Sequence, residues 1–204
     1  MFYIVVNKFH YVTCLAVTYA HTNLFLSLTE REIMLYYLAI LLYGEKRIVD
    51  LTILTEEGRL NLRVAGVILD GNKILVEQGD GCPFAVCPGG RINFNETAEN
   101  AIVREIYEEL GVRSQVERLL FIHQNFFDTD GLRNHELCFF FLLNSSLRAD
   151  GVTLKGRDNK SAYRWVAFDE LQNVFFYPLF LKKRLSDLPQ HAEPVTEIEN
   201  GEIK

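Results

Sequence analysis

Short apolar runs separated by turn residues occupy the middle of the chain. Residues 62–69 and 73–77 flank an Asp-Gly-Asn turn at 70–72, an arrangement that predicts a β-hairpin. Two longer runs, at 116–127 and 135–143, predict neighbouring antiparallel strands. These runs indicate that a β-sheet forms the centre of the fold.

A different spacing marks the segment from Ala98 to Leu110. Apolar residues recur there at steps of three and four, which is the spacing of one face of an α-helix. Thr97 is placed to cap the first turn, and Gly111 is placed to end the last one. We therefore expect a helix over roughly 98–110.

The remaining elements are shorter. The apolar run at 84–87 leads into Pro-Gly-Gly at 88–90, where we expect a strand to stop and a loop to start. Residues 161–168 predict one more strand, and 169–173 and 179–188 predict short helices. Strands and helices are interleaved without a regular βαβ period. This favours an α+β fold with a mixed sheet and packed helices over a doubly wound parallel sheet.

The pattern also divides the chain into three parts. Residues 51–190 carry the predicted elements, and 191–204 form a polar C-terminal tail that we expect to be frayed. Residues 1–50 form an N-terminal extension, whose longest apolar run, at 33–43, is about half of the ~20 residues that a membrane span needs. We predict neither a membrane span nor a secretory signal there.

The purine-rich codons that can encode Gly44-Glu45-Lys46-Arg47 suggest a second interpretation of the extension. A bacterial ribosome-binding site has this character, so translation could begin near Val49 and residues 1–50 would not be native product. Mass spectrometry of the protein expressed from its own gene tests this, and an N-terminus at Met1 would refute it.

Composition narrows the class of partner. The 204 residues carry a formal net charge of −6 with a pI near 5.4, which argues against a surface that grips polynucleotides. An acidic protein still binds small phosphates when a divalent cation supplies local positive charge. The four cysteines fit neither a paired zinc site nor a disulfide framework, so we expect reduced thiols and a cytoplasmic protein. A redox pair of Cys82 and Cys87 is the alternative.

The predicted helix carries a cluster of carboxylates. Glu105, Glu108 and Glu109 stand at i, i+3 and i+4, so they emerge on one patch near the negative, C-terminal pole of the helix. Arg104 lies four residues before Glu108 and can neutralise one charge. An ordinary solvated face is one interpretation of such a patch. A bound Mg²⁺ or Mn²⁺, which prefers carboxylate oxygens, is the other.

The residues around the patch decide between these interpretations. From Gly90, five residues lead to Glu96, seven more lead to Arg104-Glu105-Ile106, and then follow Tyr107, Glu108-Glu109, Leu110 and Gly111-Val112. This order matches every specified position of the Nudix signature: Gly, five residues, Glu, seven residues, Arg-Glu-aliphatic, any, Glu-Glu, any, Gly-aliphatic. We call residues 90–112 the Nudix box. The chain resembles the MutT-like Nudix hydrolases over roughly 61–168.

The resemblance implies a fold and a chemistry. The family folds as an α/β/α sandwich around a mixed sheet, and its members typically hydrolyse a nucleoside diphosphate linked to another group with Mg²⁺ or Mn²⁺. It implies Glu108 and Glu109 as metal ligands, Glu105 as a ligand or the water-activating base, and the Gly90 carbonyl as a further ligand. It also implies that Arg104 and Glu96 form a supporting ion pair.

Several assignments stay open. The base comes from a later loop in several family members, which makes Glu136 a second choice and Asp128 and Asp130 further candidates. Glu136 is also interpreted as an exposed residue at the start of a strand. His123 and His135 contact phosphate or pack in the core, and we favour packing for His123.

The substrate is not fixed by the sequence. The proline typical of ADP-ribose enzymes and the tyrosine typical of dinucleoside polyphosphate enzymes are both absent after the box, where Gln-Asn-Phe-Phe occupies 124–127. Nucleotide sugars, dinucleotides and modified nucleoside triphosphates therefore stay open. Phe84 and Phe127 are candidates to stack on a base, although most aromatic residues of 126–127 and 139–141 should be core.

Two further alternatives concern partners. Nudix-like domains also serve as non-catalytic nucleotide sensors, but such domains often lose box glutamates, and this chain keeps all of them. The sequence leaves open whether the protein forms a homodimer.

Overall fold

The computed structural model divides the chain into two units, Met1–Arg47 and Ile48–Lys204. It describes residues 49–129, 131–150, 154–157 and 161–199. Our interpretations of the N-terminal extension before Val49, together with Cys14 and Asp130, fall outside the described residues.

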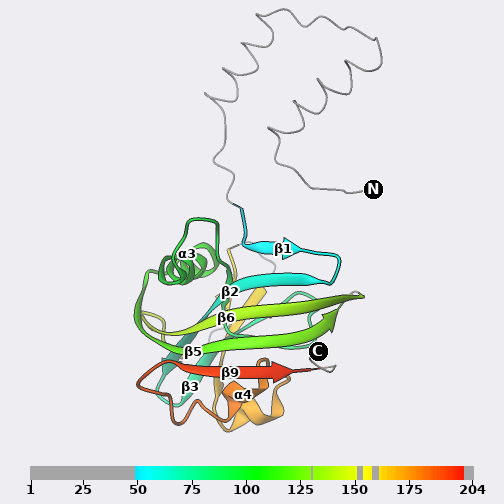
Figure 1. The fold of residues 1–204 in the computed structure, drawn as a ribbon. Coiled ribbons are helices and arrows are strands. Elements are labelled where there is room, and N and C mark those ends of the chain that lie inside the picture. The colour runs from blue at the N-terminus through cyan, green and yellow to red at the C-terminus, as the bar shows by residue number, and fades with distance from the viewer. Residues whose placement is uncertain (1–48, 130, 151–153, 158–160, 200–204) are drawn as a thin grey trace, which may run out of the picture. The chain divides into compact units, whose positions relative to one another are not determined.

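A mixed sheet runs through the second unit (Figure 1). In the described residues its main strands lie in the order β7-β8-β3-β2-β6-β5-β9, and β1 and β4 both pair with β2. The strands are β1 Thr52–Leu54, β2 Arg59–Asp70, β3 Lys73–Gly79, β4 Gly89–Arg91, β5 Ser114–Thr129, β6 Leu132–Ser145, β7 Leu154–Lys155, β8 Ser161–Ala167 and β9 Glu193–Ile198. The predicted hairpin is confirmed as β2 and β3, and the predicted antiparallel pair is confirmed as β5 and β6.

The long strand β2 organises the sheet because it pairs with four others. It runs parallel to β6 and antiparallel to β1, β3 and β4. The pairing of β2 with β4 places Val64 opposite Gly90 and thus fixes the start of the Nudix box against the sheet. We expected a loop to start at residues 88–90, and this expectation is wrong for Gly89 and Gly90, which lie in β4.

Strand β9 corrects a second expectation. We predicted that residues 191–204 fray, but Glu193–Ile198 pair in parallel with β5, from Phe121 opposite Glu193 to Phe126 opposite Ile198. In Figure 1 β9 lies beside β5 at the edge of the sheet. Residues 193–198 therefore belong to the folded domain.

Helices cover the two faces of the sheet and enclose two cores. Helix α3, Ala98–Leu110, packs Ala101, Ile102 and Ile106 against a core that includes Val64 and Phe141. The second core joins Phe121 and Phe140 of the sheet to buried residues of the 3₁₀ helix η1, Glu170–Asn173, and of α4, Leu179–Lys182. This is the predicted α/β/α sandwich, with α4 shorter than the helix predicted at 179–188.

The boundaries of α3 follow from its caps. The Thr97 side chain accepts a hydrogen bond from the amide of Asn100, and Gly111 has a left-handed φ of 71° that suits glycine. The Gly111 amide donates to the carbonyl of Tyr107. The predicted limits of this helix are confirmed.

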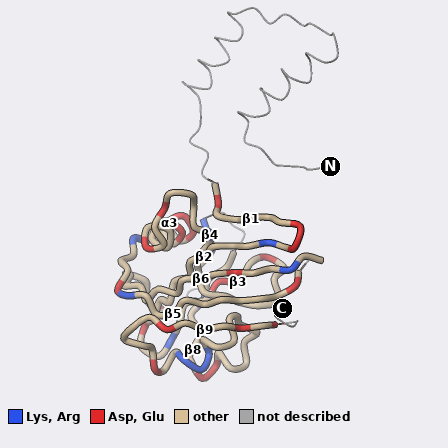
Figure 2. The backbone as a smooth tube through the Cα atoms, viewed as in Figure 1, with Lys and Arg blue, Asp and Glu red and all other residues tan. Residues whose placement is uncertain are grey.

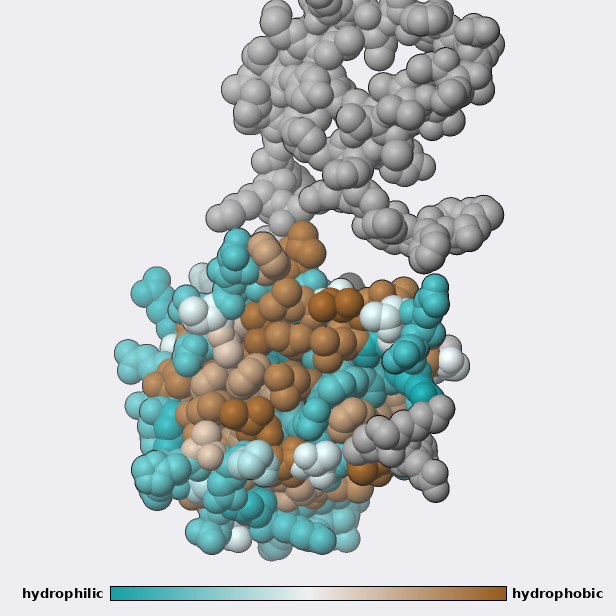
Figure 3. Space-filling model, in the orientation of Figure 1, coloured by the Kyte–Doolittle hydropathy of each residue, from teal (hydrophilic) through white to brown (hydrophobic). Residues whose placement is uncertain are grey.

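The described residues also bear on membranes and thiols. None of their helices is long and apolar enough to cross a bilayer. Apolar side chains do reach the surface (Figure 3), and Ile53, Leu54 and Phe94 are more than half exposed. Cys82, Cys87 and Cys138 are free thiols, which agrees with the expectation of reduced cysteines rather than a Cys82–Cys87 pair.

Candidate active site

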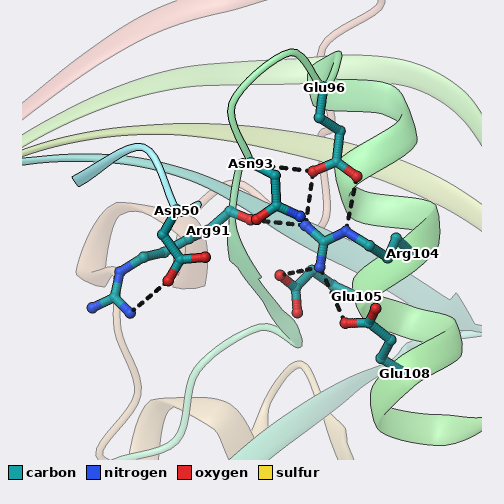
Figure 4. Close-up of polar contacts among 7 residues, drawn as sticks. All are labelled: Asp50, Arg91, Asn93, Glu96, Arg104, Glu105 and Glu108. Atoms are coloured by element: carbon teal, nitrogen blue, oxygen red, sulfur yellow. Dashed lines mark hydrogen bonds and ion pairs between the residues drawn. The ribbon is translucent and has the colours of Figure 1, made fainter. Parts of the chain in front are cut away.

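Arg104 is the centre of a hydrogen-bond network on α3 (Figure 4). Its Nε donates to Glu96 Oε1 and its Nη2 to Glu96 Oε2, both at 2.8 Å. Its Nη1 donates to Glu105 Oε1 at 2.8 Å and to Glu108 Oε2 at 3.1 Å. Nη2 also donates to the Arg91 carbonyl at 2.9 Å. The Arg104 guanidinium thus joins the loop before the helix, the end of β4 and two glutamates of α3.

Glu96 completes the loop side of this network. Its Oε2 accepts from the amide of Asn93 at 3.0 Å as well as from Arg104. The hydrogen bond from Arg104 lowers the pKa of Glu96, and the Asn93 amide acts in the same direction. Glu96 is therefore ionised, and it connects the loop before α3 to Arg104. The ion pair of Glu96 and Arg104 is the one expected from the sequence.

Glu105 lies directly against β4. A Cβ added to Gly90 would overlap the Glu105 carboxylate, so only glycine allows this approach. Burial raises the pKa of Glu105, while the hydrogen bond from Arg104 and the charge of Arg63 oppose that rise. Three of the residues named for the site, Gly90, Arg104 and Glu105, are thus in contact.

Glu109 lies in the last turn of α3 and is half-buried. It hydrogen-bonds Tyr163 of β8, and burial together with the charges of Glu77 and Glu105 raises its pKa to about 9. Its Oε2 is buried and has no hydrogen-bond partner. The three carboxylates of the predicted patch differ in exposure, because Glu108 is exposed whereas Glu105 and Glu109 are half-buried.

Residues far away in the sequence surround Glu109. Glu77 of β3 accepts a 2.7 Å hydrogen bond from Ser161, and Tyr163 lies two residues further along β8. Burial and the charges of Glu109 and Glu77 raise the pKa of Tyr163, which keeps its hydroxyl protonated. These three residues are not predicted by the sequence, because nothing in the chain order links them to the box.

Arg157 supplies a positive charge at the C-terminal pole of α3. Its amide donates to the Glu109 carbonyl at 2.8 Å, and its Nη1 donates to the Tyr107 carbonyl at 3.3 Å. The guanidinium also lies 5.6 Å from the centroid of the Tyr107 ring. A cation here opposes the unfavourable placement of glutamates at the negative helix end, and it comes from a segment that sequence spacing could not identify.

Glu136 lies in β6 and faces Arg63 of β2, with Arg63 Nε 3.6 Å from Glu136 Oε2. Burial raises the pKa of Glu136, and the charges of Arg63, His123 and Arg91 oppose the rise. The side chain is 20% exposed, so the interpretation of an exposed strand residue is wrong. Arg63 lies near both Glu136 and the glutamates of the box, because its charge also acts on Glu105 and Glu109.

The two candidate histidines differ in their surroundings. His123 is 2% exposed and packs on Phe140 and Phe180, as we favoured. His135 stacks on Phe126 with ring centroids 4.3 Å apart, and its Nε2 is 2.8 Å from Gln124 Nε2.

The aromatic candidates for substrate stacking differ in their surroundings. Phe84 is half-buried and packs edge-on to Phe175 and Tyr177, whereas Phe127 is half-buried opposite Asn134 of β6. Asp128 is exposed at the end of β5. Phe140 and Phe141 are core residues, as expected.

The box has the donors that a divalent cation needs. Figure 2 shows acidic positions along α3. The buried Oε2 of Glu109 has no hydrogen-bond partner, and a cation is one of the groups that would satisfy it. In the described residues no three acidic, histidine or cysteine side chains are grouped to hold a metal ion as they stand, and Arg104 spans Glu105 and Glu108. A cation would therefore compete with Arg104 for these two carboxylates.

Comparison with known sequences finds relatives over the same region. A Methanocaldococcus jannaschii protein named an ADP-ribose pyrophosphatase is 34% identical over 116 residues, which is 55% of this chain and 65% of that protein. A Bacillus subtilis protein named as a candidate 8-oxo-dGTP diphosphatase is 28% identical over 63% of this chain and 79% of its own length. The chain spans less than two thirds of the archaeal relative, and 43% of a MutT-like protein from Streptomyces ambofaciens.

Solved structures and a family model agree with this placement. The crystal structure of a Nudix hydrolase from Nitrosomonas europaea superposes with a TM-score of 0.51 at 17% identity, over 71% of this chain and 81% of that one, and it shows the same fold. The model of the NUDIX domain matches residues 59–187, which is more than half of the chain and includes the whole box. This chain therefore belongs to the Nudix family.

Proposed function

We propose that this protein hydrolyses a diphosphate linkage in a nucleoside diphosphate derivative and that it needs a divalent cation to do so. The observation that carries the proposal is the intact box: Arg104 holds Glu105 and Glu108 together, Gly90 makes room for Glu105, and Glu109 keeps an unpartnered carboxylate oxygen. The names of the archaeal and Bacillus relatives support the same type of bond.

The chemistry explains why these residue types are needed. Water attacks one phosphorus, the bridging P–O bond breaks, and the leaving phosphate carries away the bond electrons. A bound Mg²⁺ or Mn²⁺ would offset the charge on the diphosphate and lower the pKa of water. A carboxylate base must accept the proton that the water loses.

We assign Glu108 and Glu109 as the residues that would hold the cation, with the Gly90 carbonyl as a further ligand and Glu105 as a ligand or the base. Carboxylate and carbonyl oxygens are the ligands that Mg²⁺ and Mn²⁺ prefer. Arg104 and Glu96 are positioning residues, because they fix the loop and the glutamates without reaching the reacting atoms themselves. Arg157 supports the same end of α3.

Two residues are candidates for the base. Glu105 is already within the box, and burial raises its pKa, the direction that makes a carboxylate a better proton acceptor. Glu136 has a pKa raised for the same reason, and it faces Arg63, whose charge acts on Glu105 as well. We favour Glu105.

Kinetics of two variants separate these candidates. Removal of a general base usually lowers the rate by ~10²- to 10⁴-fold, so we expect that loss in kcat for Glu105→Gln and a much smaller one for Glu136→Gln. Metal titration of each variant serves as the control, because a ligand loss weakens cation affinity whereas a base loss does not. A near-normal kcat in Glu105→Gln with full loss in Glu136→Gln would move the base to β6.

The substrate remains at the level of a class: a nucleotide sugar, a dinucleotide or a modified nucleoside triphosphate. The relatives' names point to two different members of that class, ADP-ribose and 8-oxo-dGTP. The free thiols of the described cysteines accord with a reducing compartment, and we propose a cytoplasmic enzyme of small nucleotides.

A panel of nucleotide sugars, dinucleotides and modified nucleoside triphosphates tests the proposal. We expect phosphate or nucleotide release from at least one compound with Mg²⁺ and none after chelation. Tight binding without release across the panel would contradict hydrolysis and would favour a nucleotide-sensing module instead.

A further inference from the structure

The start of strand β8 lies against the last turn of α3. The amide of Arg157, in the segment that leads into β8, donates to the Glu109 carbonyl at 2.8 Å, and the amide of Gly156 donates to the Ser161 carbonyl at 2.8 Å. These two bonds connect the backbone of Glu109 to the first residue of β8. Tyr163, two residues further along β8, packs in the core that also contains buried residues of α3. Tyr163 is therefore distant from α3 in the sequence but close to it in the fold.

The hydroxyl of Tyr163 reaches the box. Tyr163 is 1% exposed, so its hydroxyl needs a hydrogen-bond partner within the protein. That partner is the Glu109 carboxylate, which accepts the bond. Phenylalanine would fill the same space in the core without a polar atom to satisfy. The hydroxyl therefore serves Glu109 rather than the packing of the core.

Two further polar residues accompany Tyr163 on this face of the sheet. Glu77 of β3 is in register with Tyr163, and Ser161 lies two residues before Tyr163, so the three side chains are on one face. Ser161 Oγ donates to Glu77 Oε1 at 2.7 Å. Because a serine hydroxyl has one proton, Glu77 takes the donor of Ser161. Tyr163 is the remaining hydroxyl donor of this group.

Glu109 is held on one side and unsatisfied on another. Tyr163 donates to its carboxylate, whereas its buried Oε2 has no hydrogen-bond partner. A carboxylate that is fixed by one donor keeps further lone pairs for a cation. Residues that orient a metal ligand in this way typically contribute about 10- to 100-fold to metal affinity.

From these observations we propose that Tyr163 is a positioning residue, which orients the Glu109 carboxylate for a divalent cation through its hydrogen bond to that carboxylate. The inference rests on the proposed function, because it takes Glu109 as a cation ligand. Tyr163 acts through Glu109 and needs no contact of its own with the cation or the diphosphate. Strand β8 thereby contributes to a site whose proposed ligands all lie in the Nudix box.

Binding of Mn²⁺ to the full chain tests this role without substrate. Tyr163→Phe removes one oxygen and keeps the ring, and EPR of the free Mn²⁺ gives the dissociation constant. We expect a loss of Mn²⁺ affinity of about tenfold or more, in a variant that a melting curve shows to be folded. Tyr107→Phe is the matched control, because it makes the same change at a residue of α3 that is 48% exposed. It should keep the Mn²⁺ affinity of wild type.

A double-mutant cycle shows whether Tyr163 acts through Glu109. In Glu109→Gln the carboxylate is already lost, so adding Tyr163→Phe should weaken Mn²⁺ binding by no more than about twofold further. A further loss as large as that in the wild-type background would mean that Tyr163 supports the site without Glu109. That result would overturn the positioning role.

Ser161→Ala provides a second variant in case Tyr163→Phe does not fold. Ser161 is half-buried, and its hydroxyl also lies within hydrogen-bonding reach of Tyr163. Its loss should loosen the Tyr163 side chain and weaken Mn²⁺ binding in the same direction, by a smaller factor.

Equal Mn²⁺ affinity in wild type and the folded variants would overturn the positioning role, and so would the absence of Mn²⁺ binding by wild type. Weaker Mn²⁺ binding in the variants, with no turnover of any diphosphate by wild type, would leave the positioning role standing and refute the hydrolase. The two proposals are thus tested separately.

Discussion

At the scale of single residues, Arg104 ties the site together through bonds to three glutamates and one backbone carbonyl. We expect Arg104→Lys to lower the free energy of unfolding by about 1.5–3 kcal/mol, because lysine cannot reproduce the two-pronged contact with Glu96. Urea denaturation measures this. Cation affinity should also change, since Glu105 and Glu108 lose their common partner.

Arg184→Lys is the matched control for that experiment. Arg184 pairs with Glu193 at 2.8 Å, but both side chains are a third or more exposed, so the change should cost less than about 1 kcal/mol. Equal losses in the two variants would show that Arg104 has no special role.

The raised pKa of Glu109 makes the free energy of unfolding depend on pH. Its pKa of about 9 in the folded, cation-free protein exceeds the ordinary value of 4.5, so the folded state holds a proton that the unfolded chain releases. The contribution of Glu109 to stability is therefore complete below about pH 4.5 and is lost as the pH rises toward 9. Urea unfolding between pH 5 and 9 with a chelator should show a smaller decline in Glu109→Gln than in wild type. Parallel curves would contradict the assignment.

The same proton links Glu109 to the cation. A metal ion requires the ionised carboxylate, so cation binding at pH 7 should release a proton. Calorimetric titrations of Mg²⁺ in buffers of different ionisation enthalpy measure that release, and we expect it to disappear in Glu109→Gln. Proton release that is equal in wild type and variant would assign the proton to another group.

The sequence predicted the residues of the box but not their surroundings. The spacing from Gly90 to Val112 is local, and a helix turns local spacing into geometry, so the Arg104 contacts with Glu96 and Glu108 could be anticipated. Glu77, Tyr163, Ser161 and Arg157 reach the same helix only through the pairing of β3 with β8 and the loop before β8. Contacts of that kind depend on strand order, which a single sequence does not specify.

At the scale of elements, the placement of α3 against β4 depends on one glycine. In Gly90→Ala the new methyl group would overlap the Glu105 carboxylate and displace it from β4. Displacement of a catalytic group by about 1 Å can lower turnover by about 10²-fold, and we expect a loss of that order in kcat with little change in thermal stability. Steady-state kinetics and a melting curve measure both quantities.

Gly79→Ala provides the comparison, because the nearest atom to a Cβ there is Cys82 Cβ at 3.8 Å. It should keep wild-type turnover. Unchanged turnover in Gly90→Ala as well would mean that Glu105 need not lie against β4.

The success of prediction also differed between elements. Helix α3 was predicted to the residue because a cap at Thr97 and a left-handed Gly111 mark its ends. Strand β9 was missed because its residues are alternately exposed and half-buried, so it lacks an apolar run, and its parallel partner β5 ends more than sixty residues earlier. Strand β4 was missed because glycine and proline usually interrupt strands, whereas here glycine allows an approach to Glu105.

At the scale of the whole molecule, the family match and all described elements lie after residue 48. We expect a shortened chain that starts at Val49 to have the same turnover as the full chain. Its folded domain should also melt at the same temperature as in the full chain. Differential scanning calorimetry and the hydrolysis panel compare the two chains. Loss of turnover in the shorter chain would show that residues 1–48 contribute to activity.

Hydrolysis by this protein is proposed to need a cation held by the carboxylates of α3. The most direct test compares the Mg²⁺-dependent turnover of wild type with that of Glu108→Gln. Glu108 is exposed, and within the box it pairs with Arg104. Its replacement should therefore leave the fold intact. We predict turnover that saturates with Mg²⁺ in wild type and falls by about 10²-fold or more in Glu108→Gln at equal thermal stability. Undiminished turnover in Glu108→Gln, or turnover in wild type that is independent of Mg²⁺, would contradict a catalytic cation on α3.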